Sequence, residues 1–333
     1  MKASAIANAN IALVKYWGKR NKTLKLPYNS SISMTTEGLM THTTIEFSKE
    51  YKEDLFILNG KTFKKGSKEY DDGVGRFLNV VRKKAGIRLR AKIMSYNNFP
   101  TAAGLASSAA GFAALALAVN QALCLNLNKK ELSILARRGS GSASRSIFGG
   151  FVEWKKGKRR DGLDSYAHQI VPADYWQDFR MIICITSSRE KKVSSRTGME
   201  RTVRTSPMYK AWLKTIDQDI KRIKKGIKDR NFTLVGETAQ ENCLKMHALT
   251  MTSKPSIFYW NSTTIDLINR IIEWKNQGIE CYFTIDAGPQ VKIICLEKDI
   301  KKIIKRCRYI KGVEKVIVTR PGRGARITNK HLF

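Results

Sequence analysis

The sequence predicts an α+β protein of two domains, because both halves of the chain mix short apolar strands with amphipathic helices. The first half is rich in β-type runs, whereas from Phe179 an apolar strand is followed by a succession of helices. No internal repeat or low-complexity linker interrupts the chain. We therefore expect an N-terminal domain of residues 1–178 and a C-terminal domain of residues 179–333.

Elements of the first half are predicted from apolar periodicity and turn signals. The dipeptide Asn59-Gly60 between two apolar runs is typical of a β-hairpin. Val74, Phe77, Leu78 and Val81 follow the i, i+3, i+4, i+7 spacing of a helix. Strands are expected within residues 3–17, 28–47, 53–63, 87–98 and 151–154, and helices over residues 71–86, 106–123 and 129–138.

The second half is predicted to contain a smaller sheet and more helices. Strands are expected over residues 181–185, 281–285, 291–296 and 316–318, and helices over residues 197–205, 207–228, 231–248, 262–277 and 298–309.

The charge balance is unusual, since 61 Lys and Arg stand against 28 Asp and Glu, a formal net charge of +33. Such a field attracts nucleotides, phosphorylated metabolites, nucleic acid and anionic membranes. The excess is spread along the chain, however, which favours a solvated lysine-rich surface for most of it. Residues 155–160 are typical of an exposed hairpin tip, and residues 221–228 of the solvent face of an amphipathic helix.

Cysteine and histidine spacing argues against a structural metal. The six cysteines include no C-x-x-C pair, and the four histidines lie far apart, so no His/Cys-bound metal is predicted. Most cysteines have apolar neighbours, which indicates reduced, buried thiols. Residues 1–10 lack the basic start and long apolar stretch of a signal peptide, so we expect a cytoplasmic location.

The stretch of residues 97–119 contains no charged residue and has Pro100 near its start. It is rich in Ala, Ser and Gly, which contribute too little transfer energy for a membrane span. Residues 112–119 are predicted to pack as a core helix. Ahead of them, Gly104, Ser107 and Ser108 fall at a helix N-terminus, where free N–H groups and the helix dipole attract anions. No Walker sequence is present, and composition alone leaves a phosphate site and a plain buried helix both open.

Residues 97–112 resemble the phosphate-binding motif of the galactokinase, homoserine kinase, mevalonate kinase and phosphomevalonate kinase (GHMP) superfamily. Ala106 replaces the glycine usual in the kinases, a trait of the diphosphomevalonate decarboxylase family within it. Further blocks similar to that family follow in order and cover nearly the whole chain, at residues 9–20, 26–33, 138–146, 148–154, 193–206, 255–260 and 286–289.

This resemblance implies a two-domain GHMP kinase fold with the active-site cleft between the domains. It also implies a carbon–carbon lyase of the mevalonate pathway of isoprenoid biosynthesis. Such an enzyme converts mevalonate 5-diphosphate and ATP to isopentenyl diphosphate, ADP, phosphate and carbon dioxide. ATP and Mg²⁺ are the expected cofactors, with no assigned protein ligand for the metal. A homodimer is usual in the family, and neither a specific nucleic acid nor a membrane is an expected partner.

The resemblance also implies roles for single residues. Asp286 would take or orient the proton of the substrate 3-hydroxyl, although by residue type alone an Asp before Ala-Gly-Pro is more often a turn former. Arg145 would hold the substrate carboxylate through its planar fork. With Lys19 these form the predicted catalytic set. The predicted substrate-binding residues are Asn10, Tyr16, Lys19, Ser140, Ser142, Arg145 and Thr202. The predicted ATP-binding residues are Pro100, Ala103, Gly104, Leu105, Ala106, Ser107 and Ser108. Trp17 is interpreted equally well as a packing residue or as a wall of the substrate site.

The sequence departs from the family pattern at Ser144, Gln290 and the pair Arg196-Thr197, and none of these changes removes a catalytic group. Arg196 with Lys191 and Lys192 either tunes the diphosphate or nucleotide pocket or belongs to the general basic excess. A monophosphate decarboxylase or a sister GHMP kinase is the alternative enzyme. A nucleic-acid binder is the alternative of another class, against which the chain shows no RNP1-like or helix-turn-helix pattern.

Overall fold

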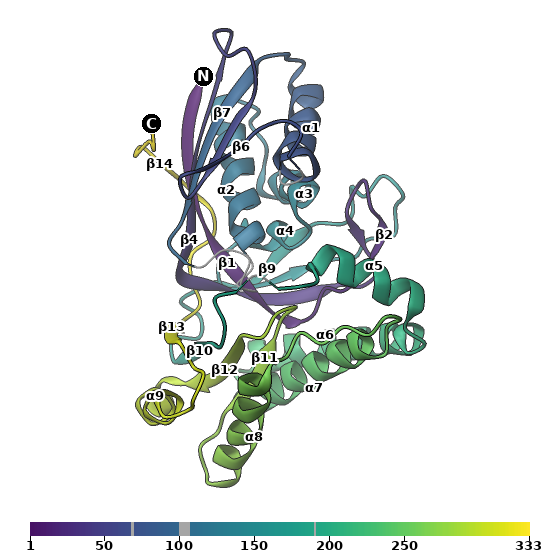
Figure 1. Cartoon of the computed structure of the whole chain (residues 1–333), viewed down its shortest axis with the longest axis vertical. Coiled ribbons are helices and arrows are strands. Elements are labelled where there is room, and N and C mark those ends of the chain that lie inside the picture. Colours follow the sequence, from purple (N-terminus) through teal and green to yellow (C-terminus); the bar gives the residue numbers. More distant parts are fainter. Residues whose placement is uncertain (68–69, 100–106, 190) are drawn as a thin grey trace.

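The computed structural model describes residues 1–67, 70–99, 107–189 and 191–333. Within them the chain forms a large mixed sheet backed by helices, and a smaller sheet packed against a second group of helices (Figure 1). This α+β architecture is the one that the strand and helix patterns predict.

The first sheet has the order β14-β1-β4-β7-β5-β6, and β8 and β9 extend it from β4. Its strands are β1 (Lys2–Val14), β4 (Ser31–Ser48), β5 (Leu55–Leu58), β6 (Lys61–Phe63), β7 (Arg90–Asn97), β8 (Phe151–Trp154), β9 (Ala167–Val171) and β14 (Arg326–Thr328). A separate two-stranded hairpin joins β2 (Lys19–Asn21) to β3 (Leu26–Pro27).

Helix α2 (Ser107–Ala122) packs on the two long strands β1 and β4. Alternate alanines of β1, among them Ala5 and Ala7, face the alanines of α2 in one buried cluster. Small side chains on both sides bring the helix axis close to the sheet, which explains the alanine-rich composition of both segments. The core helix predicted from Phe112 onward is therefore confirmed, with Phe112 itself partly buried.

Other helices of the first half are the π-turn η1 (Tyr70–Gly75), α1 (Arg76–Ala85), α3 (Lys129–Gly139) and α4 (Ala143–Ser146). The helix expected over residues 71–86 thus begins as a π-turn. The hairpin predicted at Asn59-Gly60 is confirmed, and both residues have the positive φ of a type I′ turn, 48° and 80°. Residues 155–160 form the turn between β8 and β9, as predicted.

The second sheet has the order β11-β12-β10-β13, with all neighbours antiparallel. Its strands are β10 (Phe179–Ile185), β11 (Tyr282–Ile285), β12 (Val291–Leu296) and β13 (Lys315–Thr319). The helices of this half are α5 (Ser195–Thr205), α6 (Tyr209–Lys228), α7 (Phe232–Met251), α8 (Ser262–Asn276), the short 3₁₀ turn η2 (Glu297–Asp299) and α9 (Ile300–Arg308).

Two features connect the halves. The end of the chain returns to the first sheet, where β14 pairs with β1, so the two termini lie near each other (Figure 1). One buried cluster also joins residues of β1 to residues of β10, α6 and α7. Within the described ranges, we find no helix whose length and hydropathy would let it cross a membrane.

Candidate active site

Among the described residues, no carboxylate contacts the buried guanidinium of Arg145. Its residue is 2% exposed, and its guanidinium donates to Asn10 Oδ1, to Ser33 Oγ at 2.9 Å and to the hydroxyl of Ser31. These bonds use Nε–H and one N–H on each outer nitrogen, which leaves one donor on each outer nitrogen without a partner in the described part of the chain. Burial lowers the pKa of Arg145 to about 10, an effect opposed by Asp286 and Tyr16. A buried guanidinium paired only with hydroxyls and an amide is suited to an anionic ligand.

Asn10 is fully engaged in holding this arginine. Its Nδ2 donates to Ser142 O at 3.0 Å and to Ser146 Oγ at 2.8 Å, while its Oδ1 accepts both bonds from Arg145. The register of β1 on β4 shifts between Asn8 and Asn10, and such an irregularity re-aims a side chain. Asn10 therefore fixes the position of the Arg145 guanidinium.

Tyr16 brings a second unsatisfied donor to the same place. Its hydroxyl is buried and has no hydrogen-bond partner among the described residues. Burial raises the pKa of Tyr16 well above its usual range, so the phenol stays protonated and can donate. A Cβ on Gly141 would lie 2.9 Å from both Tyr16 Oη and the Trp154 ring, so only glycine leaves room for the tyrosine.

A row of hydroxyls leads from this pair to the start of α2. Ser142 Oγ lies 3.3 Å from Ser140 Oγ, which lies 3.2 Å from Ser108 Oγ in the first turn of the helix. Ser107 and Ser108 are thus at the helix N-terminus, as predicted. The other predicted ATP-binding residues, Pro100, Ala103, Gly104, Leu105 and Ala106, lie outside the described residues.

Asp286 lies between two buried lysines. Lys15 Nζ is 2.8 Å from Asp286 Oδ1, and Lys292 Nζ is 3.4 Å from Oδ2. Lys15 is 2% exposed and Lys292 is fully buried, whereas the carboxylate side chain keeps 22% exposure. Burial alone would raise the pKa of Asp286, but the two lysines outweigh it and hold the pKa well below its usual range. Asp286 is therefore ionised at every physiological pH.

The turn that carries Asp286 is fixed from several sides. Gly288 N–H donates to Asp286 O at 2.8 Å, which closes the tight turn predicted from the Asp-Ala-Gly-Pro sequence. On the strand before it, the carbonyl of Ile285 accepts from His247 Nε2 at 3.2 Å, so the proton of this imidazole is on Nε2. Burial lowers the pKa of His247 to about 3, which keeps the ring neutral.

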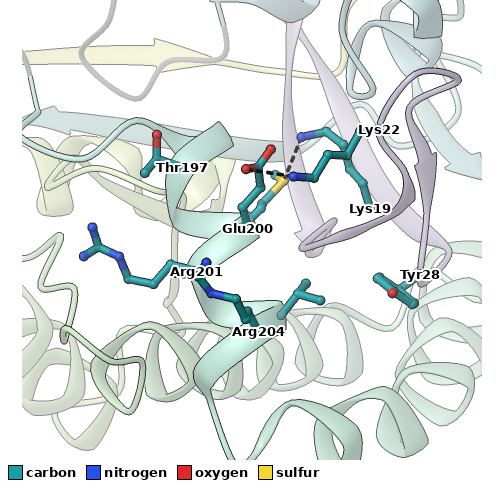
Figure 2. Close-up of a pocket in the computed structure, with 9 residues that line it drawn as sticks. Lys19, Lys22, Tyr28, Thr197, Glu200, Arg201 and Arg204 are labelled. Carbon is teal, nitrogen blue, oxygen red and sulfur yellow. Dashed lines mark hydrogen bonds and ion pairs between the residues drawn. The ribbon is translucent and has the colours of Figure 1, made fainter.

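A basic cavity of about 420 Å³ opens between the β2–β3 hairpin and α5 (Figure 2). Figure 2 shows Lys19 and Lys22 reaching toward α5, where Lys22 pairs with Glu200 at 3.1 Å. Burial and the neighbouring Arg196 lower the pKa of Lys19 to about 8. The residues that line the cavity are Lys19, Lys22, Tyr28, Thr197, Met199, Glu200, Arg201, Val203 and Arg204.

Two residues considered from the sequence lie in the core instead. Thr202 is fully buried on the inner face of α5, where its hydroxyl accepts from Ser253 Oγ at 3.1 Å. Trp17 is 2% exposed and belongs to the buried cluster that joins the two halves, so its role is packing. Arg196, left open from the sequence, pairs with Asp72 at 3.2 Å and thus connects α5 to η1.

Four residues of the site were missed from the sequence: Lys15, Ser31, Ser33 and Lys292. The first three lie inside blocks that carry the family resemblance. A signal for Lys292 was present, because it interrupts the apolar run of β12, where an unpaired lysine would be costly.

A large sheet covered by α2, which carries Ser107 and Ser108 in its first turn, joined to a smaller sheet that carries Asp286 just after β11, is the architecture of the GHMP kinase superfamily. The family model for the diphosphomevalonate decarboxylase-like N-terminal domain matches residues 7–167, and that for the mevalonate 5-diphosphate decarboxylase C-terminal domain matches residues 181–320. The chain belongs to the diphosphomevalonate decarboxylase family.

Individual relatives agree over the full length. The diphosphomevalonate decarboxylase of Candida albicans is 37% identical, and the match covers 99% of this chain and 99% of that protein. The mevalonate diphosphate decarboxylase of Staphylococcus aureus is 42% identical, with a TM-score of 0.92 and 98% of each chain covered. MDDEF in complex with MVAPP, AMPPCP and magnesium is also 42% identical, with a TM-score of 0.91 over 98% of this chain and 99% of that one.

Proposed function

We propose that this cleft carries out the reaction of the family, the ATP-dependent decarboxylation of mevalonate 5-diphosphate to isopentenyl diphosphate, ADP, phosphate and carbon dioxide. The observation that carries the proposal is the pairing of two groups in one neighbourhood. Arg145 is a buried cation with free donors, and Asp286 is a carboxylate kept ionised by Lys15 and Lys292.

Arg145 receives the substrate carboxylate on its two free outer N–H groups, in the parallel geometry that a guanidinium offers. The neighbouring Tyr16 hydroxyl donates to an oxygen of the diphosphate, and Lys19 neutralises part of its charge. Ser140 and Ser142 add hydroxyl donors between the diphosphate and the start of α2. Asn10 is a positioning residue, since all its polar atoms are used within the protein.

Asp286 accepts a hydrogen bond from the 3-hydroxyl and directs its oxygen lone pair at the phosphoryl group. Its low pKa makes it a weak base, which suits a loose phosphoryl transfer that needs little proton removal before the new O–P bond forms. The hydroxyl proton passes to the Asp286 carboxylate as that bond forms, because the oxygen becomes more acidic when it bonds to phosphorus. The C3–O bond then breaks with loss of phosphate, the electron pair of the bond to the carboxylate carbon forms the C=C bond, and carbon dioxide departs.

The first turn of α2 is suited to ATP phosphates, because Ser107 and Ser108 add hydroxyls at the positive end of the helix dipole. Bound Mg²⁺ would neutralise phosphate charge. Outside the undescribed residues 68–69, 100–106 and 190, no cluster of three or more His, Cys, Asp or Glu could hold a metal. The residues present therefore fit a metal carried mainly by the phosphates of ATP, with serine hydroxyls as the available protein oxygens.

The activity is tested by supplying the purified protein with ATP and either mevalonate 5-diphosphate or the 5-monophosphate, while carbon dioxide and ADP are measured together. We expect equal amounts of both products from the diphosphate and a far lower kcat/KM with the monophosphate, because Tyr16 and Lys19 lose the second phosphate. Accumulation of phosphorylated substrate without carbon dioxide would instead identify a kinase.

The oligomeric state and the compartment complete the proposal. We assign a homodimer from the family resemblance, with light scattering as its test. We assign the cytoplasm because all six cysteines are free and five are buried, as suits a reducing compartment. Cell fractionation tests this location.

A further inference from the structure

Lys25 lies where the β2–β3 hairpin meets the N-terminus of α2. Its Nζ donates to the carbonyl of Gly139, the last residue of α3, and lies 5.7 Å from the centre of the Phe112 ring. Phe112 is on α2, about one turn beyond Ser108. A Cβ on Gly139 would be 2.0 Å from Phe112, so this glycine permits the close approach. The residue after it, Ser140, is the one that contacts Ser108.

Four other cations act on Lys25, and they come from four different elements. They are Lys19 on β2, Arg76 on α1, Arg138 on α3 and Arg196 on α5. The carboxylates that the described residues place at this cluster are fewer: Asp72 is shared between Arg76, at 2.8 Å, and Arg196, at 3.2 Å, and Glu200 is paired with Lys22.

The cluster also holds an unsatisfied donor. Nε of Arg138 is buried and makes no hydrogen bond to any described residue. Within the described part of the chain, these five cations outnumber the nearby carboxylates and repel one another, and the buried N–H of Arg138 adds a further cost. Both costs are removed when a highly charged anion enters.

We propose that Lys25 is a further phosphate-binding residue for ATP, placed on the hairpin side of the site opposite Ser108. The inference rests on the proposed function, since it takes ATP as the anion at α2. The nucleotide is favoured over the diphosphate because the direct contacts of Lys25 are to Gly139 and to Phe112 of α2, beside the Ser108–Ser140 pair.

The state of the amine changes when the nucleotide binds. Burial, followed by Arg196, Lys19, Arg76 and Arg138, lowers the pKa of Lys25 to about 7 in the free protein. A bound phosphate would raise that pKa again, since an opposite charge favours the ammonium form. At pH 8 the free amine is about 10% protonated, so binding would take up about 0.9 proton at Lys25, whereas at pH 6 it would take up about 0.1.

The test compares Lys25→Met and Lys25→Arg with the wild type, and uses Lys61→Met as a matched control. Lys61 Nζ also lies over a phenylalanine ring, at 5.4 Å from Phe63, but on the distant β5–β6 hairpin. Binding of AMPPCP with Mg²⁺ is measured by calorimetry in buffers of different ionisation enthalpy, which gives Kd and the number of protons taken up. This measurement needs no turnover, so it stands even where carbon dioxide formation fails.

We expect Lys25→Met to weaken nucleotide binding about tenfold or more. At pH 8 this variant should take up about 0.9 fewer protons per nucleotide bound than the wild type. Lys25→Arg should bind within about threefold of the wild type yet lose the same uptake, because arginine stays charged. Uptake at Lys19 is matched most closely between the wild type and Lys25→Met, because Lys25 is mostly neutral in the free wild type at pH 8. Unchanged Kd and proton count in Lys25→Arg and Lys25→Met, or an effect confined to KM for the diphosphate substrate, would overturn the proposal.

Discussion

The candidate site contains two charged side chains, Arg145 and Asp286, whose surroundings differ in their own charge. Asp286 has a lysine on each carboxylate oxygen, so its charge is compensated within the protein. The hydrogen-bond partners of Arg145 within the described residues are all neutral, from Asn10, Ser31 and Ser33, so they orient its charge without compensating it. A paired charge is suited to holding a fixed ionisation state, and an unpaired one to receiving an ion.

This difference in surroundings matches the different roles that we propose for Arg145 and Asp286. In the proposed reaction, Arg145 would bind the substrate carboxylate, which is consumed when it leaves as neutral carbon dioxide. The side with Asp286 must stay ionised throughout, and Lys15 and Lys292 provide that. If Arg145 were instead paired with a carboxylate of the protein, it would attract the substrate carboxylate less strongly.

The largest effect is expected from Arg145→Met, which removes the uncompensated charge. We expect kcat/KM for mevalonate 5-diphosphate to fall about 10³-fold, from lost carboxylate binding and orientation. Thermal unfolding should change little or shift upward, because a buried cation without a carboxylate is replaced by an apolar side chain. A large loss of stability with normal kinetics in the remaining folded protein would show that Arg145 is structural.

Lys15→Met tests the compensated side. Loss of one lysine raises the pKa of Asp286 toward or above its ordinary value, because burial then acts with less opposition. The proposed mechanism needs the ionised carboxylate, so Lys15→Met should lose kcat at mildly acidic pH, where the wild type keeps Asp286 ionised. Lys61→Met is the control with an unchanged profile. If kcat of Lys15→Met depended on pH as in the wild type, Lys15 would not control the pKa of Asp286.

Tyr16→Phe removes a buried hydroxyl that has no partner in the described structure. We expect KM for the diphosphate to rise about tenfold, as one hydrogen bond to a charged oxygen is lost. The melting temperature should stay level or increase, since an unsatisfied polar group leaves the interior. A lower melting temperature with the same KM would mean that the hydroxyl serves the fold.

The smallest effect is expected from Thr202→Val, a predicted substrate residue that the structure buries against Ser253. Loss of this hydrogen bond should lower the free energy of unfolding in urea by about 1 kcal/mol. Steady-state kinetics should remain within about twofold of the wild type. A tenfold higher KM would restore Thr202 to the substrate site.

Much of the fold was predictable because its long elements have a clear period. β1, α2 and the helices from α5 to α8 all lie where apolar spacing or turn chemistry places them. β2, β3, β14 and α4 have two to four residues each, too few for a period, and β14 forms only because the chain end returns to β1.

Three central residues of the candidate site were predictable from the sequence, but several residues that contact them were not. Arg145, Tyr16 and Asp286 stand in motifs whose residue types match the chemistry. Lys292 became a partner of Asp286 only through the pairing of β11 with β12, a long-range register that spacing does not reveal. Thr202 is a motif residue that was predicted to bind substrate, but its side chain faces the protein core and contacts Ser253 instead.

The central claim is that Asp286 acts on the substrate hydroxyl as an ionised carboxylate. Asp286→Asn keeps the shape and removes the charge, and its carbon dioxide release from mevalonate 5-diphosphate tests the claim most directly. We expect turnover to fall at least about 10³-fold while AMPPCP still binds within a few-fold of the wild type. Wild-type rates of carbon dioxide release from the folded variant would remove Asp286 from the mechanism.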